Sequence, residues 1–319
     1  MGSPRLLVWT VPEHRKLVAD AVSTSGAELV GMGSDSLAGA AACSRVLDTT
    51  PIADIREAIQ CDDADIMWMT TAISIESPLR QLMECRPRRY LLSEPPAGAV
   101  ADLLSETMPV PQASLVPLMR FSPGYLMAQD ALNEFGEITS VHMAFRCGAG
   151  EGGLAGRLFD AMDLVDCLCG EPEGIFATLR SPLPGIPEPL DQLHGHLGAS
   201  LRMADHRCIT LSLSNLAGTW FRGVTIIGEG GTLRLSDNSM QWLGPDGRQI
   251  DTTPAKRPLR PGELVGQQIR RISENRDVLD APSNDTHLLV LCETARLSCL
   301  TGQVECPSSL RNMLYTSVG

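Results

Sequence analysis

Short apolar runs alternate with segments of helical periodicity over the first 120 residues of the chain. The apolar runs are Arg5–Trp9, Ala27–Gly33, Asp65–Thr70, Arg89–Leu92 and Ser114–Met119, and the helical segments are His14–Thr24, Ser36–Cys43, Ile52–Gln60, Pro78–Cys85 and Val100–Met108. A strand of a parallel sheet is buried on both faces, so it reads as a continuous apolar run and needs a helical crossover to the next strand. The alternation therefore predicts a doubly wound, Rossmann-like parallel α/β sheet, with ligands at the edge where the strands end.

A second pattern begins after about residue 120. The expected elements are a helix at Gly124–Phe135, a strand at Ile138–Arg146, an Asp-rich helix, a strand at Ile175–Leu179, five alternating runs (His196–Met203, Cys208–Leu216, Arg222–Gly228, Gly231–Asp237 and Ser239–Gly244) and a final helix at Thr286–Thr301. Turn residues separate the alternating runs, and Arg180–Pro189 and Pro254–Gly262 are proline-rich loops. We therefore expect two domains, residues 1–120 and 121–319, the second an α+β domain with a large, mostly antiparallel open sheet.

The Asp-rich helix lies within the stretch Gly152–Thr178. Its apolar residues recur at helical spacing and form one stripe, while Asp160, Asp163 and Asp166 follow each other at intervals of three along a neighbouring side. On a solvated face, three such carboxylates repel each other only weakly. If they line a cleft instead, burial raises carboxylate pKa values and makes acid–base chemistry possible. Both interpretations stay open at the level of sequence.

Composition narrows the classes of partner. The formal net charge of −12, without a prominent basic stretch, argues against nucleic acid and anionic membranes as partners. No apolar run approaches the roughly 20 residues of a transmembrane helix, and the run near the N-terminus is too short for a secretory signal. Ten cysteines without a CxxC pair or zinc-like spacing indicate reduced thiols. These features predict a cytoplasmic protein with no metal site.

A few other side chains are candidates for ligand contacts. His194 and His196 would share one face of an extended segment, as a metal pair requires, but two histidines beside a proline-rich loop are more often surface residues. His142 alternates with apolar neighbours and faces either a cleft or solvent. Arg120 and Arg146, near strand ends, either bind an acidic or sugar-like substrate or pair with carboxylates.

Six stretches in the same order resemble the Gfo/Idh/MocA oxidoreductases, relatives of glucose-fructose oxidoreductase and inositol dehydrogenase. They are DADIMWMTTA, LLSEPPAGAVADLLSE, the segment from Val116 to Phe145, the Asp-rich helix followed by Gly170, IIGEGGTLRLSD and ETARLSCLTGQVECP. They span nearly the whole chain. The resemblance implies a first domain that binds NAD or NADP, and a second domain whose sheet forms the substrate site and the contact of a homodimer or higher homo-oligomer.

The chain departs from this family at three functional positions. The turn after the first strand reads Trp9–Arg15 without a glycine, whereas the family's glycine-rich turn lets backbone amides approach the pyrophosphate. Pro95 follows Glu94 where the family has a lysine, and Asp160 stands where it has its catalytic histidine, with Asp163 at the nearby aspartate. Proline neither carries charge nor donates a hydrogen bond. All three departures affect the chemistry rather than the fold.

The resemblance implies roles for a set of residues. The cofactor contacts would come from Thr10, Val11, His14, Arg15, Ser34, Asp35, Thr71 and Glu94, substrate contacts from Arg120, His142 and Arg146, and catalysis from Asp160, Asp163 and Glu94. Three hypotheses follow: a divergent NAD(P)-dependent oxidoreductase acting on a sugar- or polyol-like alcohol, a non-catalytic ligand-binding or partner-subunit protein that keeps the fold, and a lyase or hydrolase that uses the carboxylates without a nucleotide.

Overall fold

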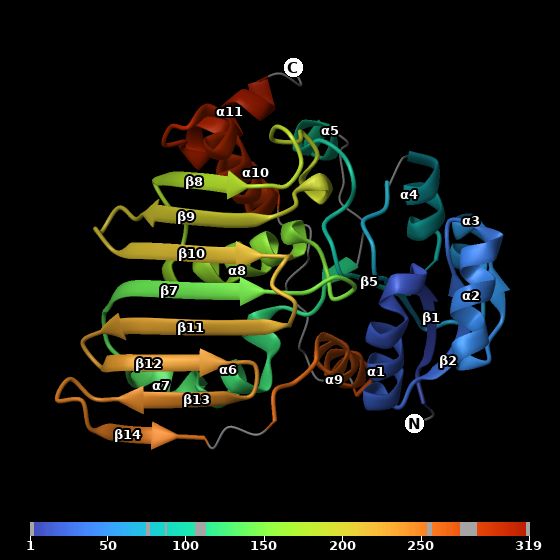
Figure 1. Cartoon of the computed structure of the whole chain (residues 1–319), viewed down its shortest axis with the longest axis horizontal. Coiled ribbons are helices and arrows are strands. Elements are labelled where there is room, and N and C mark those ends of the chain that lie inside the picture. The colour runs from blue at the N-terminus through green and yellow to red at the C-terminus, as the bar shows by residue number, and fades with distance from the viewer. Residues whose placement is uncertain are drawn as a thin grey trace. The chain divides into compact units, whose positions relative to one another are not determined.

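The computed structural model describes residues 3–74, 77–86, 88–105, 113–253, 257–274 and 286–316. The chain forms two compact units, each with its own sheet. The first unit comprises Met1–Pro117, Ala149–Gly152 and Arg260–Asp285, and the second comprises Leu118–Gly148, Gly153–Leu259 and Thr286–Gly319. The two sheets are shown in Figure 1.

The first unit contains a six-stranded parallel sheet in the order β3-β2-β1-β4-β5-β6. Its strands are β1 (Arg5–Trp9), β2 (Glu28–Gly33), β3 (Pro51–Ile52), β4 (Ile66–Met69), β5 (Arg89–Leu92) and β6 (Ala113–Leu115). Its helices are α1 (Arg15–Ser25), α2 (Leu37–Leu47), α3 (Ile55–Gln60), α4 (Ser77–Glu84), α5 (Val100–Ser105) and α9 (Pro261–Ser273), with a 3-10 turn at Pro12–His14. The residues of β4 are fully buried, as expected for a strand inside a parallel sheet.

Helix α9 joins the first unit from a distant part of the sequence, because it packs on α1. Two glycines, Gly262 and Gly266, allow the close approach. A Cβ atom at these positions would lie 2.3 Å from the carbonyl oxygen of Leu17 and 2.5 Å from that of Ala21. The two helix backbones therefore approach each other closely over about one turn of α9.

The second unit contains an eight-stranded sheet in the order β14-β13-β12-β11-β7-β10-β9-β8. The strands are β7 (Ile138–Arg146), β8 (Gly174–Arg180), β9 (His196–Arg202), β10 (Cys208–Ser214), β11 (Phe221–Gly228), β12 (Gly231–Ser236), β13 (Ser239–Leu243) and β14 (Gln249–Thr252). All neighbours are antiparallel except β7 and β10, which are parallel. The helices of this unit are α6 (Pro123–Met127), α7 (Gln129–Glu134), α8 (Leu154–Cys169), α10 (Thr286–Thr301) and α11 (Pro307–Thr316).

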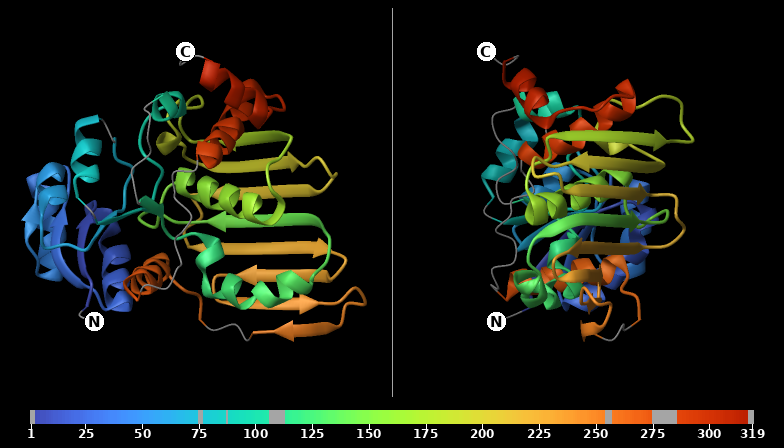
Figure 2. Two further views of the ribbon diagram at one scale, coloured as in Figure 1. Left: turned by 180° about the vertical axis from the view of Figure 1, so that it is seen from behind. Right: turned by 90° about the vertical axis from the view of Figure 1, so that its left-hand side faces the viewer.

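One face of this second sheet is covered by helices and the other is open. Figure 2 shows α8, α10, α6 and α7 on the same side of the sheet. Strand burial follows this division, because inward residues such as Leu211 and Ile226 are buried while alternate residues are partly or fully exposed. The core of the second unit therefore lies between the helices and one face of the sheet.

The predicted fold class is confirmed, and Arg5–Trp9, Arg89–Leu92, Ile138–Arg146 and Thr286–Thr301 form the expected elements at the expected bounds. Other expectations were wrong in detail. The strand expected at Ser114–Met119 already ends at Leu115, and the helix expected at Gly124–Phe135 is divided at Ala128 into α6 and α7. Residues 106–108 of one expected helix and 254–256 of one expected loop lie outside the described residues.

The sequence patterns missed β3, β14, α9 and α11. Strands β3 and β14 have two and four residues, too few for a periodic signal, and every residue of β14 is exposed. In the described part of the chain, no helix combines the length and the hydropathy that crossing a membrane would require.

Candidate functional site

The carboxyl edge of the parallel sheet has a break in chain direction between β1 and β4. From β1 the chain proceeds through β2 to β3 on one side, and from β4 through β5 to β6 on the other. Crossovers on either side of such a break leave a crevice at the strand ends, which is where open α/β sheets bind their ligands. The residues that follow β1 and β4 are therefore the first candidates for a binding site.

A chain of hydrogen bonds joins the residues at this break. The Thr10 and Thr70 hydroxyl oxygens lie 2.8 Å apart, and Nδ1 of His14 lies 2.9 Å from the Thr70 hydroxyl. Both threonines are buried. Burial lowers the pKa of His14, and the carboxylate of Glu13 offsets only part of this effect. At neutral pH the ring is therefore uncharged and adds no positive charge for a phosphate.

The turn between β1 and α1 is built without glycine. Pro12 opens the 3-10 turn, which places a residue without an N–H at the start of the segment. The neighbouring segment Ala149–Gly152 packs on it, since a Cβ atom at Gly150 would lie 2.8 Å from the carbonyl oxygen of Glu13. These residues do not fit the usual backbone cradle for a pyrophosphate, which needs a tight turn and free amides at the helix start.

The other predicted cofactor residues lie at the ends of neighbouring strands in the first unit. Just after β2, Ser34 is buried and Asp35 is exposed. Ser36 then caps the N-terminus of α2, because its hydroxyl oxygen accepts a hydrogen bond from the Gly39 N–H at 3.0 Å. Val11 and Thr71 are half-buried, Arg15 is exposed, and Glu94 is buried just after β5. The position of Asp35 fits a hydrogen bond to a ribose hydroxyl, as acidic residues after the second strand provide in dinucleotide-binding folds.

In the second unit, Asp160 lies at the centre of a buried ion network. The Met119 N–H donates to Asp160 Oδ1 at 2.6 Å, and Arg222 Nη1 donates to Asp160 Oδ2 at 2.7 Å. Arg157 Nη1 lies 3.7 Å from the same Oδ2. The side chains of Asp160 and Arg222 have no exposed surface. Both oxygens of Asp160 are therefore occupied by donors from the chain itself.

The network continues from Arg222 to β12 and the loop before β11. Arg222 Nε donates to Asp237 Oδ1 at 2.7 Å, and Trp220 Nε1 donates to Asp237 Oδ2 at 2.8 Å. The guanidinium groups of Arg157 and Arg222 lie 4.3 Å and 5.1 Å from the Trp220 ring centroid. Burial alone lowers the pKa of Arg222, but the carboxylates of Asp237 and Asp160 outweigh it and keep this pKa above its ordinary value. Two arginines and two aspartates thus balance each other in charge.

The other two aspartates of α8 have separate partners. Arg120 Nε lies 2.8 Å from Asp163 Oδ2, and His287 Nε2 lies 2.9 Å from Asp166 Oδ1. Asp163 is buried, whereas the Asp166 side chain keeps 35% of its surface exposed. The solvated-face interpretation is therefore wrong for Asp160 and Asp163. Each carboxylate is paired with its own cation or imidazole, so the described contacts do not bring Asp160 and Asp163 together on one ligand.

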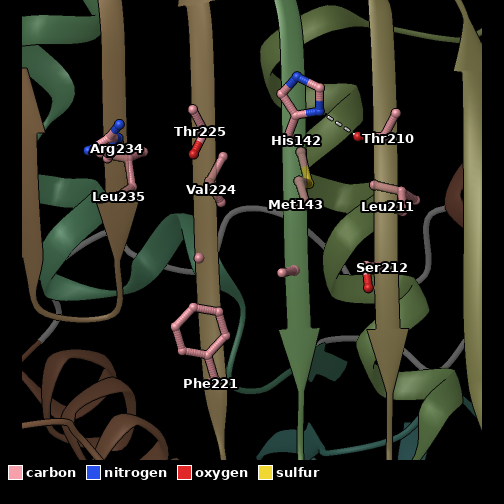
Figure 3. A pocket seen from close by; sticks show the side chains of 12 residues that line it. His142, Met143, Thr210, Leu211, Ser212, Phe221, Val224, Thr225, Arg234 and Leu235 are labelled. Carbon is pink, nitrogen blue, oxygen red and sulfur yellow. Dashed lines mark hydrogen bonds between the residues drawn. The ribbon is translucent and has the colours of Figure 1, made fainter. Parts of the chain in front are cut away.

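His142 and Arg146 lie on the open face of the second sheet, opposite the face that α8 covers. His142 Nδ1 lies 2.6 Å from the Thr210 hydroxyl oxygen, and its Nε2 lies 3.1 Å from that of Ser140. Figure 3 shows His142 beside Thr210 at one end of a shallow depression of about 480 Å³, with Phe221 at the other end. The Arg146 guanidinium lies 5.9 Å from the Phe221 ring centroid. The structure therefore does not group these residues with Arg120, which contacts α8.

Among the described residues, no group of three His, Cys, Asp or Glu side chains is arranged to hold a metal ion. His194, which the sequence offered as one half of a metal pair, contacts the Asn215 side chain. No sequence pattern singled out Arg222, Asp237, Arg157 or Trp220. A signal was present for Arg222, because it occupies an inward position of an alternating strand where an apolar residue is expected.

No protein-family model matches the sequence, and no curated protein sequence matches it. Solved structures match over almost the whole chain. Levoglucosan dehydrogenase in complex with NADH and L-sorbose has a TM-score of 0.72 at 14% identity, and the alignment covers 96% of this chain and 99% of that chain. This chain therefore shares the fold of that dehydrogenase, as the resemblance implied.

Two further structures support the same fold. An oxidoreductase from Agrobacterium radiobacter in complex with NAD+, L-tartaric acid and magnesium has a TM-score of 0.71 at 14% identity, covering 97% of this chain and 100% of that chain. An NAD-binding oxidoreductase from Klebsiella pneumoniae has a TM-score of 0.69 at 12% identity, covering 95% of this chain and 98% of that chain. At such identities the likeness shows the fold, and the activity has to be argued from the residues.

The buried network predicts a stability effect at Asp160. Replacing Asp160 by Asn removes the charge that balances Arg222, so we expect the free energy of unfolding to fall by about 3–5 kcal/mol. Urea denaturation followed by circular dichroism measures this change. Asp166→Asn on the same helix is the matched control, since its partially exposed pair should contribute less than about 1 kcal/mol. Equal effects of the two substitutions would contradict the central place of Asp160.

Proposed function

We propose that this protein binds a small hydroxyl-bearing molecule on the fold of a sugar or polyol oxidoreductase without catalysing hydride transfer by that fold's usual acid–base groups. The observation that carries this proposal is the state of Asp160, which stands where the resemblance places the catalytic histidine. Its two carboxylate oxygens accept hydrogen bonds from Met119 and Arg222, and its side chain has no exposed surface.

A general base must reach the proton of the substrate hydroxyl within hydrogen-bond distance. For Asp160 this would require a substrate to displace the Arg222 guanidinium, leaving a buried cation with only part of its charge balance. Breaking a buried pair in this way costs about 3–5 kcal/mol. We therefore interpret Asp160 as a residue that holds the loop before α6 and strand β11 in place.

In the family that the sequence resembles, a lysine and the catalytic histidine are the acid–base groups, and the lysine position is changed here as well. Pro95 follows Glu94 at the carboxyl end of β5, where the resemblance places a lysine. A proline side chain has no polar atom to hold or pass a proton. Neither of the two usual acid–base groups is therefore present, which supports a binding role over turnover.

A divergent NAD(P)-dependent oxidoreductase is the second candidate function. It is favoured by Asp163, whose partner Arg120 keeps 22% of its side-chain surface exposed, so this pair lies closer to solvent than Asp160 does. One structural neighbour holds NADH and L-sorbose, and another holds NAD+ and L-tartaric acid. The lyase or hydrolase hypothesis needs carboxylates that share a proton, and the separate pairing of Asp160 and Asp163 gives it no support.

An assay for hydride transfer separates the two candidates. With D-glucose, D-xylose, myo-inositol or D-gluconate and either NAD+ or NADP+, we expect no change in absorbance at the nicotinamide wavelength beyond that of a protein-free sample. If turnover appears, Asp163→Asn should reduce it by about 10²–10⁴-fold, which would establish the oxidoreductase and overturn the binding role. Asp130→Asn, at an exposed position of α7, serves as the control for a nonspecific loss.

The turn after β1 predicts weak dinucleotide binding. Each lost amide contact to a charged group costs about 1.5–3 kcal/mol, so two losses leave NADH with a dissociation constant in the high micromolar range or weaker. The Asp35 carboxylate should also make NADPH weaker than NADH, because it would repel a 2′-phosphate. Calorimetric titration measures both constants, and Asp35→Ser should reduce the difference between them. A submicromolar constant for NADH would refute this expectation.

We further propose that the protein forms a homodimer through the open face of the second sheet. The apolar residues of β9 and β10 face the helices, so the surface offered to a second copy consists of the alternate residues of these strands. A row of small residues crosses the open face instead: Thr178, Gly198, Ser212, Ala144, Gly223, Ser236 and Ser239. Phe176, Phe221 and Ile227 are exposed there, and small side chains let a second sheet approach closely.

Light scattering tests this assembly. At micromolar concentration the protein should show twice the monomer mass, and Phe221→Asp should shift it towards the monomer because it places a charge on the face that the dimer would bury. Leu183→Asp, at an exposed leucine in a loop far from β11 in sequence, is the control and should leave the dimer unchanged. A wild-type protein of monomer mass would disprove the dimer.

A further inference from the structure

The loop between β8 and β9 lines a cavity in the second unit. It has a volume of about 740 Å³, and its lining consists of residues 181–187 and 191–194 together with Gly153 and Asn215. This volume is within the range of sites that bind small molecules, about 300–1,000 Å³. Of the side chains that the sequence offered as candidates for ligand contacts, His194 is the one that lines it.

The wall of this cavity is held rigidly. Arg296 Nη1 donates to the Pro187 carbonyl oxygen at 3.1 Å, and the same guanidinium is paired in a bidentate manner with Glu293 at 2.6 and 2.7 Å. Leu190 and Leu193 are buried and fasten the second half of the loop. Four prolines between residues 181 and 190 fix the backbone further. The cavity is thus formed before any ligand binds, which reduces the entropic cost of binding.

Polar groups are concentrated at the base of the loop. The Gly195 N–H donates to Asn215 Oδ1 at 2.8 Å, so the Asn215 amide nitrogen faces His194 Nδ1, 2.9 Å away. In this arrangement Nδ1 accepts, and the proton of the neutral imidazole is on Nε2. Within the described part of the chain, Nε2 of His194 has no hydrogen-bond partner, so it is available as a donor.

The charge of the lining selects among ligands. It includes the carboxylate of Asp191 but neither lysine nor arginine among its described residues. An anionic ligand would meet no lysine or arginine side chain among the described lining residues, and the negative charge of Asp191 disfavours it. Hydroxyl groups can donate to a carboxylate and accept from the His194 N–H, while Leu183, Ile186 and the prolines offer apolar surface to the C–H groups of a ring.

We propose that this cavity binds an uncharged polyhydroxylated molecule, of about the size of one or two sugar rings, in preference to a sugar acid or a phosphorylated sugar. His194 and Asp191 contact its hydroxyl groups, and Asn215 is a positioning residue that fixes the His194 tautomer. This assignment rests on the proposed binding function and names its site and its charge preference.

Calorimetry and saturation-transfer NMR on the full chain test the preference. The uncharged probes are D-glucose and myo-inositol, and the anionic probes of similar size are D-gluconate and D-glucose 6-phosphate. We expect an uncharged probe to bind with a dissociation constant of about 0.1–10 mM, and the anionic probes to bind about tenfold more weakly or worse. Tighter binding of an anionic probe, or no uncharged probe bound at about 50 mM, would overturn the proposal.

Variants locate the binding. His194→Ala removes one donor and should weaken the uncharged probe by about 3–10-fold. Leu183→Trp fills the cavity from an exposed position and should abolish binding without unfolding the chain, and it keeps the test valid if His194→Ala does not fold. Leu300→Trp is the matched control, since Leu183 and Leu300 are 59% and 56% exposed. Equal binding by the two tryptophan variants would place the ligand elsewhere.

The outcome is independent of the hydride-transfer assay. Turnover with a nicotinamide cofactor would refute the non-catalytic proposal, yet the cavity assignment would stand if binding still responded to Leu183→Trp and not to Leu300→Trp. If no turnover is found and Leu183→Trp leaves the affinity for the uncharged probe unchanged, the assignment of binding to this cavity is refuted and the non-catalytic proposal stands.

Discussion

The ion pair between Asp160 and Arg222 is the interaction on which the second unit depends most. It joins the central turn of α8 to β11, two elements 62 residues apart, across the core. Two charges this deeply buried are tolerated only when each is paired and their remaining hydrogen bonds are satisfied. Met119 and Asp237 complete this requirement, so the loop before α6 and the end of β12 are fixed by the same pair.

The periodic part of the fold could be predicted from sequence, because strands and helices leave their period in neighbouring residues. The bounds of β1, β5, β7 and α10 were obtained in this way. The partners of the α8 aspartates could not be predicted, because Arg222 and His287 lie 62 and 121 residues from Asp160 and Asp166. No local pattern encodes which arginine meets which carboxylate. Helix α9 was not predicted for the same reason, because its two glycines are explained only by their close contact with α1, which is distant in sequence.

The two candidate ligand sites of the fold share a physical feature. At the break of the parallel sheet, Thr10, Thr70 and His14 hydrogen-bond to each other, and on α8 the Asp160 carboxylate is held by Arg222. A polar group that normally meets a ligand must find a partner within the protein if it is buried, since an unpaired one costs about 1–3 kcal/mol. Both sites therefore satisfy their own polar groups, and a ligand would have to compete with them.

The loop between β8 and β9 presents the opposite situation. Its base holds a His194 ring whose Nδ1 is used by Asn215, while Nε2 has no partner in the described residues, and its wall is anchored by Arg296 from α10. A ligand entering there would gain a donor without breaking an internal contact, whereas a ligand at Asp160 would first have to separate a buried ion pair. On this comparison of costs, the cavity of the β8–β9 loop is the more accessible site for the proposed uncharged ligand, while Asp160 stabilises the packing of the core.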